Sequence, residues 1–232
     1  MGVVQHAEFT GTFPISSGAV AFASNVVAGN TIVVCTTRYQ PVPVTFTVTD
    51  SLGNTYTAGT NQAQGNYHAR TARAENITGG ACTVTVTIDA GSDLWFSITE
   101  VDNAPAASFD AQATAAGTST GPTVSLTTVA DSTIAFGVST HDNGTDPALG
   151  VGAGYTLIHE QEGGSAVMPG ISEYQAFATA GAKTVNTTIS TSAGWAIASI
   201  SIKQNVAGGG PTVRRMNNLR PNIFAPGGEG AF

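Results

Sequence analysis

Apolar and polar residues alternate with a period of two along most of this chain. The alternating runs are bounded by Gly, Asn, Asp or Pro, which is typical of half-buried β-strands. No window of 11 or more residues carries the apolar stripe of an amphipathic helix. The pattern therefore predicts an all-β, antiparallel β-sandwich or jelly-roll-like protein. Its strands are expected at 19–23, 30–39, 44–50, 67–76, 81–89, 94–102, 108–115, 122–128, 132–140, 154–160, 170–177, 183–190 and 194–203.

The first half of this strand series resembles the second half. "NTIVVCTTR" from Asn30 matches "STIAFGVST" from Ser132, and "TGGACTVTVTI" from Thr78 aligns with "TAGAKTVNTTI" from Thr179. The offset stays within about 99 to 102 residues through the whole register, and a constant offset is the mark of an internal repeat. We therefore predict an internal duplication.

The same alignment sets "LWFSITEV" around Trp95 beside "GWAIASIS" around Trp195. It predicts that the two tryptophans occupy equivalent positions, and their apolar strand neighbours predict a role in core packing. The pseudo-repeats are expected at about 15–104 and 105–206.

Each pseudo-repeat has about six or seven strands, which is the size of a β-sandwich. The two repeats could form two small sandwiches, or they could interleave into one two-sheet body. The connection at 102–122 contains the strand-like "SFDAQATA" and is typical of a sheet rather than of a flexible linker. We predict one compact body at 1–206, followed by an extended C-terminal arm at 207–232.

Composition supports the β-fold and limits the function classes. The 232 residues are 41% hydrophobic, but only 10% are charged, against about 25% in a usual soluble domain. Residues 1–206 hold five basic and 14 acidic residues, a net charge of −9, whereas residues 207–232 hold three Arg and one Glu, a net charge of +2. A body this acidic lacks the clustered Lys and Arg of a nucleic-acid surface, so no nucleic-acid partner is expected.

The two cysteines and the N-terminal sequence indicate the cellular compartment in which the protein is made. Cys35 and Cys82 both lie in Thr/Val strand runs, where a free Cys behaves as a small apolar residue. We predict that they are unpaired, with a disulfide between them as the alternative. The start "MGVVQHAEFTGTF" has neither a basic region nor an apolar stretch of a secretory signal. No segment reaches membrane-spanning length, so assembly in a host cytoplasm and no membrane partner are expected.

Motifs of catalysis are missing from the sequence. It contains no H-E-x-x-H, G-x-S-x-G, P-loop or C-x-x-C pattern, and such motifs carry the activated nucleophiles and metal clusters of many enzymes. We predict that the protein is not an enzyme and needs no cofactor. A hydrolase with a scattered site would instead require His141 and His159 to meet acidic side chains in space.

Two weaker binding interpretations concern loops. The segment "HDNGTDPALG" offers oxygen ligands for Ca²⁺ from Asp142, Asn143 and Asp146, but a solvated loop with Asx-type turns needs no ion and is the preferred interpretation. Otherwise no metal is expected. Three tyrosines near loops or strand ends could stack on sugar rings: Tyr39, Tyr67 and Tyr155.

The order of these strand and turn motifs resembles that of jelly-roll β-sandwich proteins of phage virions and bacterial surface proteins. It is carried by "GNTIVV", "VTDSLGNTY" and "ENITGGACTVTVTI", followed by "SFDAQATAAG", "STIAFGVS" and "GWAIASISIK". The resemblance covers most of residues 19–203. It implies a structural or binding role and carries over no functional residue.

The C-terminal segment "GGGPTVRRMNNLRPNIFAPGGEGAF" differs from the body in kind. Glycines give it a hinge, and prolines block regular helix and strand. Its apolar and basic side chains predict an arm that binds neighbouring copies of the chain, or a major capsid or tail protein. The expected contact residues are Arg214, Arg215, Met216, Leu219, Arg220, Ile223, Phe224 and Phe232.

These observations together lead to a functional hypothesis. The chain is expected to be a structural protein on the surface of a phage-like virion or similar particle, as a capsid decoration or cement subunit or a tail or fibre component. The alternative is a carbohydrate-binding β-sandwich that recognises a cell-surface polysaccharide.

Overall fold

The computed structural model describes residues 2–39, 46–143, 148–162 and 168–205. These residues form an all-β, antiparallel protein, as the sequence predicts. No helix among them could cross a membrane. The fifteen strands of the described chain are β1 (Val3–Ala21), β2 (Thr31–Tyr39), β3 (Phe46–Asp50), β4 (Thr57–Ala58), β5 (Gln62–Gln64), β6 (Tyr67–Ala74), β7 (Thr83–Val101), β8 (Phe109–Ser119), β9 (Thr123–Thr128), β10 (Thr133–His141), β11 (Leu149–Val151), β12 (Thr156–Gln161), β13 (Gly170–Phe177), β14 (Gly181–Ile189) and β15 (Ala193–Lys203).

The first repeat folds around a long two-stranded ribbon. β1 and β7 are 19 residues each and pair along their whole length, with register shifts between Gly11 and Ser17. One half of the ribbon continues into β2, β6 and β4, and the other half pairs with β3. The ribbon therefore contributes to both layers of the first sandwich and nearly closes it.

In the second repeat, the strands that correspond to this ribbon form two separate pairs. β8 pairs with β15, and β9 pairs with β14. Gly121 and Pro122 separate β8 from β9, and proline cannot donate to a ladder. The result is a five-stranded sheet, β12-β13-β10-β15-β8, facing a three-stranded sheet, β11-β14-β9.

The strand registers repeat between the halves. Ile32 faces Ala74 on one side and Glu100 on the other. Ile134 faces Ala176 and Ile202, each 102 residues later. Among the described strands, no ladder joins one repeat to the other. The two halves of the chain thus form two sandwiches, not one interleaved sandwich.

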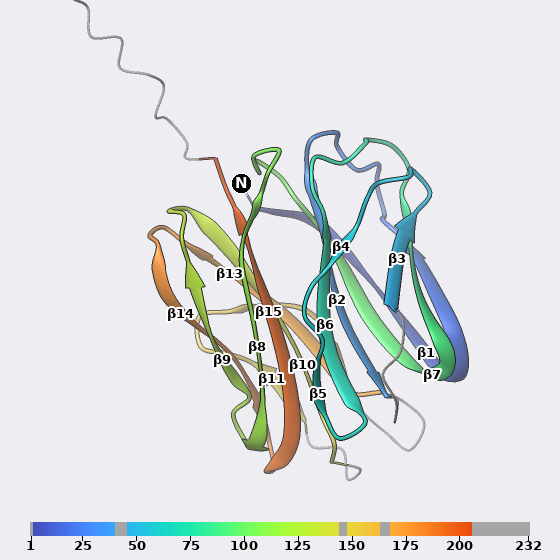
Figure 1. The fold of residues 1–232 in the computed structure, drawn as a ribbon, viewed down its shortest axis with the longest axis vertical. Helices are drawn as coiled ribbons and strands as arrows, with labels where there is room; N and C mark the ends of the chain where they lie inside the picture. The colour runs from blue at the N-terminus through green and yellow to red at the C-terminus, as the bar shows by residue number, and fades with distance from the viewer. Residues whose placement is uncertain (1, 40–45, 144–147, 163–167, 206–232) are drawn as a thin grey trace, which may run out of the picture.

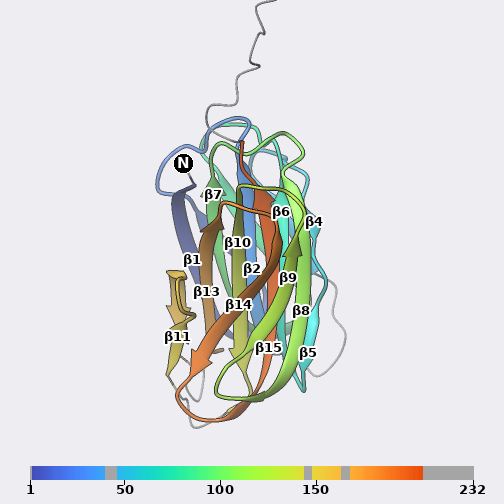
Figure 2. The same cartoon turned by 90° about the vertical axis from the view of Figure 1, so that its left-hand side faces the viewer.

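The two sandwiches pack back to back through their larger sheets. Figure 1 shows the resulting layers side by side, and Figure 2 looks onto the second sandwich. The shared core contains Val33 and Trp95 from the first repeat, and Phe136, Val138 and Ile200 from the second. Separate cores fill each sandwich. The strands β2, β10 and β15 are consequently buried on both faces, which explains why their sequences are nearly continuous apolar runs.

The two tryptophans are buried, but the prediction that they are equivalent is wrong. Trp95 faces Thr37, and the corresponding pair in the second repeat is Ile197 with Ser139. Trp195 lies two residues earlier, and Trp195 and Ile197 both lie in the core of the second sandwich, whereas Trp95 lies between the sandwiches. A shift of two residues leaves every side chain on the same face of its strand. The alternation pattern therefore could not detect the error.

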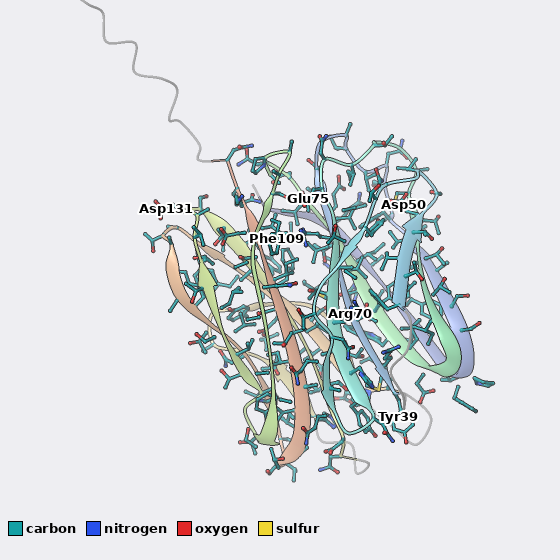
Figure 3. The ribbon with its side chains drawn as sticks, in the orientation of Figure 1. Tyr39, Asp50, Arg70, Glu75, Phe109 and Asp131 are labelled. Carbon is teal, nitrogen blue, oxygen red and sulfur yellow. The ribbon has the colours of Figure 1, made fainter. Side chains whose placement is uncertain are left out.

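Hydrogen bonds to Glu75 fix the connection between the repeats at the start of β8. The Glu75 carboxylate accepts hydrogen bonds from the amide of Phe109 at 2.6 Å and from the Ser108 hydroxyl at 3.2 Å. The Arg73 guanidinium lies 3.8 Å from the centroid of the Phe109 ring and binds Glu75 through Nε at 3.1 Å. Figure 3 labels Glu75 and Phe109. Burial raises the pKa of Glu75, but these hydrogen bonds outweigh burial and lower it overall.

Arg70 lies on the opposite face of β6, 4.7 Å from the centroid of the Phe46 ring. Residues 70 and 73 therefore form no common basic patch, as the strand period predicts. Cys35 and Cys82 are both free and buried in different cores. The prediction of unpaired cysteines is confirmed.

Candidate functional site

A hollow of about 320 Å³ opens where β10 begins, β13 ends and the chain leaves β15. We call it the β10–β13 hollow. None of its lining side chains ionises near neutral pH, so the arrangement can bind but offers no general acid or base. The lining residues are Ser132, Thr133, Ile134, Ala176, Phe177, Ala178 and Gln204.

Local backbone geometry fixes the rim of this hollow. Ser132 has a left-handed backbone with a φ of 56°, which turns the chain into β10. The Ser132 amide donates to the carbonyl of Ala178 at 3.2 Å, and the Gln204 amide donates to the carbonyl of Ser132 at 2.8 Å. These bonds hold the ends of three chain segments around one opening.

The floor of the hollow is apolar and preformed. Ile134 is buried and pairs with Ala176, which is exposed. The Phe177 ring is held by Tyr155 in an edge-to-face contact at 6.5 Å between centroids, and Lys183 Nζ lies 5.0 Å from its centroid. An apolar group that enters the hollow would therefore meet a supported aromatic ring.

Two buried polar atoms at the hollow have no hydrogen-bond partner within the described residues. They are the hydroxyl oxygen of Thr133, a residue only 1% exposed, and Gln204 Oε1. An unsatisfied buried polar group costs about 1–3 kcal/mol. Both atoms are shielded from solvent, so this cost belongs to the packing of the wall of the hollow.

The charge at the rim is mixed. Asp131 is exposed next to Ser132, and its carboxylate accepts a 2.7 Å hydrogen bond from the Ala180 amide. Figure 3 places Asp131 at the end of the molecule where β15 ends, far from Tyr39 at the opposite end. Lys183 is the neighbouring cation.

All the arm residues predicted to contact partners lie outside the described residues. This set comprises Arg214, Arg215, Met216, Leu219, Arg220, Ile223, Phe224 and Phe232. The N-terminal strand is described, and residues 3–11 are paired with β7. That strand belongs to the sheet.

The calcium candidate is only partly described. The Asp142 carboxylate accepts a 2.7 Å hydrogen bond from the Gly194 amide, and the Asn143 amide donates to His141 Nδ1 at 3.3 Å. Asp146 lies outside the described residues. In the described part of the chain, no group of three or more His, Cys, Asp or Glu side chains is arranged to hold a metal ion.

The histidines gather differently from the arrangement that a hydrolase would need. His159 Nε2 lies 2.9 Å from His6 Nδ1, and its Nδ1 lies 3.4 Å from the Glu8 carboxylate. This cluster joins β1 of the first sandwich to β12 of the second. Burial and His6 lower the pKa of His159, and Glu8 opposes that shift. His141 is instead fully buried within the second repeat.

Two of the three candidate sugar-stacking tyrosines come together. Tyr39 and Tyr67 meet edge to face with centroids 5.2 Å apart, and Asn66 donates to the Tyr39 hydroxyl at 3.2 Å. Tyr155 is buried, and its hydroxyl donates to the carbonyl of Thr184. Its assignment as a sugar-stacking residue is therefore wrong: the side chain is part of the core.

Sequence reasoning missed the β10–β13 hollow. Thr133 and Gln204 look like ordinary strand-end residues in the sequence, and their lack of partners depends on how three distant segments meet. Comparisons with protein-family models, with curated proteins and with solved structures find no match to this chain.

Proposed function

We propose that this protein is a non-enzymatic structural subunit of a phage-like virion or similar assembly. It would be an accessory component of the particle surface, as capsid decoration or cement, or as part of a tail or fibre. Its partners would be neighbouring copies and a major capsid or tail protein, and residues 207–232 would anchor it.

The difference in charge and in apolar content between the body and the segment after β15 supports this proposal. The body is acidic and ends its last ladder at Lys203, and the following segment is basic and rich in large apolar side chains. Burying one such side chain in a partner yields about 1.5–3 kcal/mol, and the arginines can bind carboxylates on an acidic neighbour.

The stiffness of the body supports the same role. Two sandwiches share a third core between them, so neither can rotate against the other without exposing apolar surface. A subunit that reinforces a particle needs such a body and a separate means of attachment.

Limited proteolysis with trypsin tests this proposal. We expect rapid cleavage after Arg214, Arg215 and Arg220 in the free protein and protection of the same bonds in particles from the native source. Arg38 and Lys203 lie in strands and serve as internal controls that resist in both samples. Equal cleavage of the C-terminal sites in both samples would refute the anchoring role.

The tyrosine pair favours a second candidate, glycan binding. Tyr39 is 37% exposed and lies beside Tyr67 and Asn66, and exposed aromatic faces with a nearby amide suit sugar rings. A glycan array with the full chain and a Tyr39→Ala variant tests it. Binding that survives the substitution unchanged, or no binding by the unmodified protein, excludes this site.

A further inference from the structure

We propose that His6 of β1 and His159 of β12 together bind a divalent transition metal of tetragonal preference, Cu²⁺ or Ni²⁺. The site is independent of the proposed function. Within the described residues no third His, Cys, Asp or Glu side chain is arranged to complete it, so water or another external ligand takes the remaining positions. The two imidazoles come from different sandwiches, and a bound metal would link the sandwiches at one edge.

The separation of the two ring nitrogens matches neighbouring positions around such a metal. His6 Nδ1 lies 2.9 Å from His159 Nε2. With metal–nitrogen distances of about 2.1 Å, this separation corresponds to an angle of about 90° at the metal. Tetragonal Cu²⁺ and Ni²⁺ sites have such angles, whereas tetrahedral zinc needs its nitrogens about 3.4 Å apart. The pair therefore suits a tetragonal metal better than zinc.

The distance between the rings agrees with this geometry. Their centroids are 4.7 Å apart and their planes meet at 76°. Two imidazoles that bind one metal at about 90° have centroids about 4.6 Å apart, given metal–nitrogen distances of about 2.1 Å. A straight N–H···N hydrogen bond of the observed length would place the centroids about 5.2 Å apart. The rings are thus closer than a straight hydrogen bond requires, and their separation is that of two ligands of one metal.

A β-bulge in β12 directs His159 towards β1. Leu157 pairs with Glu173 and His159 pairs with Ser172, so two steps along β12 match one step along β13. Paired residues point to the same face of a sheet. The Glu173 carboxylate faces the interior of the second sandwich, whereas the Ser172 hydroxyl accepts a 2.8 Å hydrogen bond from Ser97 of the first repeat. The bulge therefore turns His159 towards the first repeat, and re-aiming a side chain is a common role of bulges.

The outer nitrogen of His159 faces a carboxylate, as in many metal sites. His159 Nδ1 lies 3.4 Å from Glu8 Oε2, and the same oxygen accepts a 3.3 Å hydrogen bond from Trp95 Nε1. The carboxylate favours a proton on Nδ1, which leaves the lone pair of Nε2 directed at His6. Metal-binding histidines almost always have such a partner, which fixes the ring and its tautomer. Because Trp95 is fully buried, the shared core holds this carboxylate in place.

The protonation of the two rings suits metal binding at neutral pH. Burial lowers the pKa of His159, Glu8 opposes this shift and His6 adds to it, so the His159 ring is neutral and can bind a cation. His6 is exposed, and its Nδ1 proton can move to Nε2 through solvent, so the ring binds without a net loss of protons. The chain also carries a net charge of −7, which raises the concentration of cations at its surface.

Titration of the full chain with Cu²⁺ tests the site. Isothermal titration calorimetry at neutral pH, in a buffer that does not bind metals, should show one Cu²⁺ bound per chain. Electron spin echo envelope modulation of the complex should show two coordinated imidazoles. His6→Asn and His159→Asn should each weaken binding by about tenfold or more, and each should leave the signal of one imidazole, because a single ring holds the metal far less firmly.

Glu8→Gln tests the orienting carboxylate. It should weaken Cu²⁺ binding by about tenfold, the usual effect of losing such a partner. Glu162→Gln is the matched control, because it removes the same charge from an exposed position directly after β12 and should leave the affinity unchanged.

Urea unfolding with Ni²⁺ tests the link between the sandwiches. Only the folded chain holds both imidazoles together, so saturating Ni²⁺ should raise the urea midpoint of the unmodified protein. The His159→Asn variant should show no such rise.

Each contrary result counts against a named part of the proposal. No Cu²⁺ binding by the unmodified protein, or binding that survives both histidine substitutions, would overturn the site. The signal of a single imidazole in the unmodified protein would overturn paired coordination, and this result needs no variant to fold. Tighter binding of Zn²⁺ than of Ni²⁺ would overturn the tetragonal geometry. An unchanged urea midpoint with Ni²⁺ would overturn the link between the sandwiches.

Discussion

Glu173 is a carboxyl group in the interior of the second sandwich, and its titration gives a sharp test of the structure. The residue is fully buried in β13, opposite Gly137. One carboxyl oxygen accepts a 2.8 Å hydrogen bond from the Gly152 amide, and the other has no hydrogen-bond partner within the described residues. Burial raises the pKa of Glu173 from 4.5 to about 8, although the Gly152 hydrogen bond opposes the shift.

The sign and size of the effect follow from linkage. Between pH 4.5 and 8 the folded state holds a proton that the unfolded state has released, so raising the pH through this window favours unfolding. The stabilising contribution is fully present below pH 4.5 and is lost as the pH rises through about 8. At about 1.4 kcal/mol per pKa unit, the loss between pH 5 and pH 8.5 is about 4 kcal/mol.

The perturbation is Glu173→Gln, and the assay is urea unfolding at intervals from pH 5 to pH 8.5. Glutamine cannot ionise, so the difference in unfolding free energy between variant and unmodified protein should shift by about 4 kcal/mol towards the variant across this range. Glu162→Gln is the matched control, because Glu162 is exposed and its substitution leaves the buried carboxyl of Glu173 in place.

Parallel pH profiles of the Glu173→Gln variant and the unmodified protein would refute the reasoning. Such a result would mean that the carboxylate is already ionised in the folded state near pH 6. If the variant does not fold, the carboxyl ¹³C resonance of Glu173 in the unmodified protein can be titrated instead. A midpoint near 4.5 would lead to the same refutation.

Three further outcomes are expected from the packing and the clusters. Gly170→Ala should lower the unfolding free energy by about 1–3 kcal/mol in urea, because a Cβ would lie 2.7 Å from the Trp95 ring; an unchanged midpoint would contradict the tight packing between the sandwiches. Glu75→Ala should cost about 2 kcal/mol, since it leaves the Phe109 amide without its acceptor; a stability loss equal to that of an exposed-site control would contradict this. The lowered pKa of His159 makes the fold lose stability as the pH falls below 6.5. His159→Asn should therefore weaken the dependence of the unfolding free energy on pH between pH 6.5 and 5. An NMR titration midpoint of His159 above 6.5 would reverse that expectation.

The alternation of side chains was enough to predict the class of fold. A strand that packs one face inward must alternate, and the Thr- and Val-rich runs do so throughout the sequence. The continuous apolar runs of β2, β10 and β15 also indicate burial on both faces. Burial of both faces, and hence a second layer of packing, follows from "TIVVCTTR" and "WAIASISI" once the sheets are stacked.

The misplacement of Trp195 shows where sequence comparison fails. Its alignment with Trp95 matched residue type, but the ladder places Ile197 at the corresponding position. Backbone pairing sets the register, and a two-residue error costs nothing in the alternation pattern. The pairing partner of each tryptophan therefore needed the ladder, although Trp195 and Ile197 lie in the same core of the second sandwich.

The sequence by itself determined the β-class, the resemblance between the two halves, the buried unpaired cysteines and the contrast between an acidic body and a basic C-terminal segment. These features depend on composition and on local periodicity, which are properties of the chain. Only the tertiary structure decided that the repeats form two sandwiches packed back to back. It alone brought His6 to His159 across 153 positions and left Thr133 and Gln204 unsatisfied at one hollow. Such sites depend on long-range packing of surfaces, which no local pattern of residues specifies.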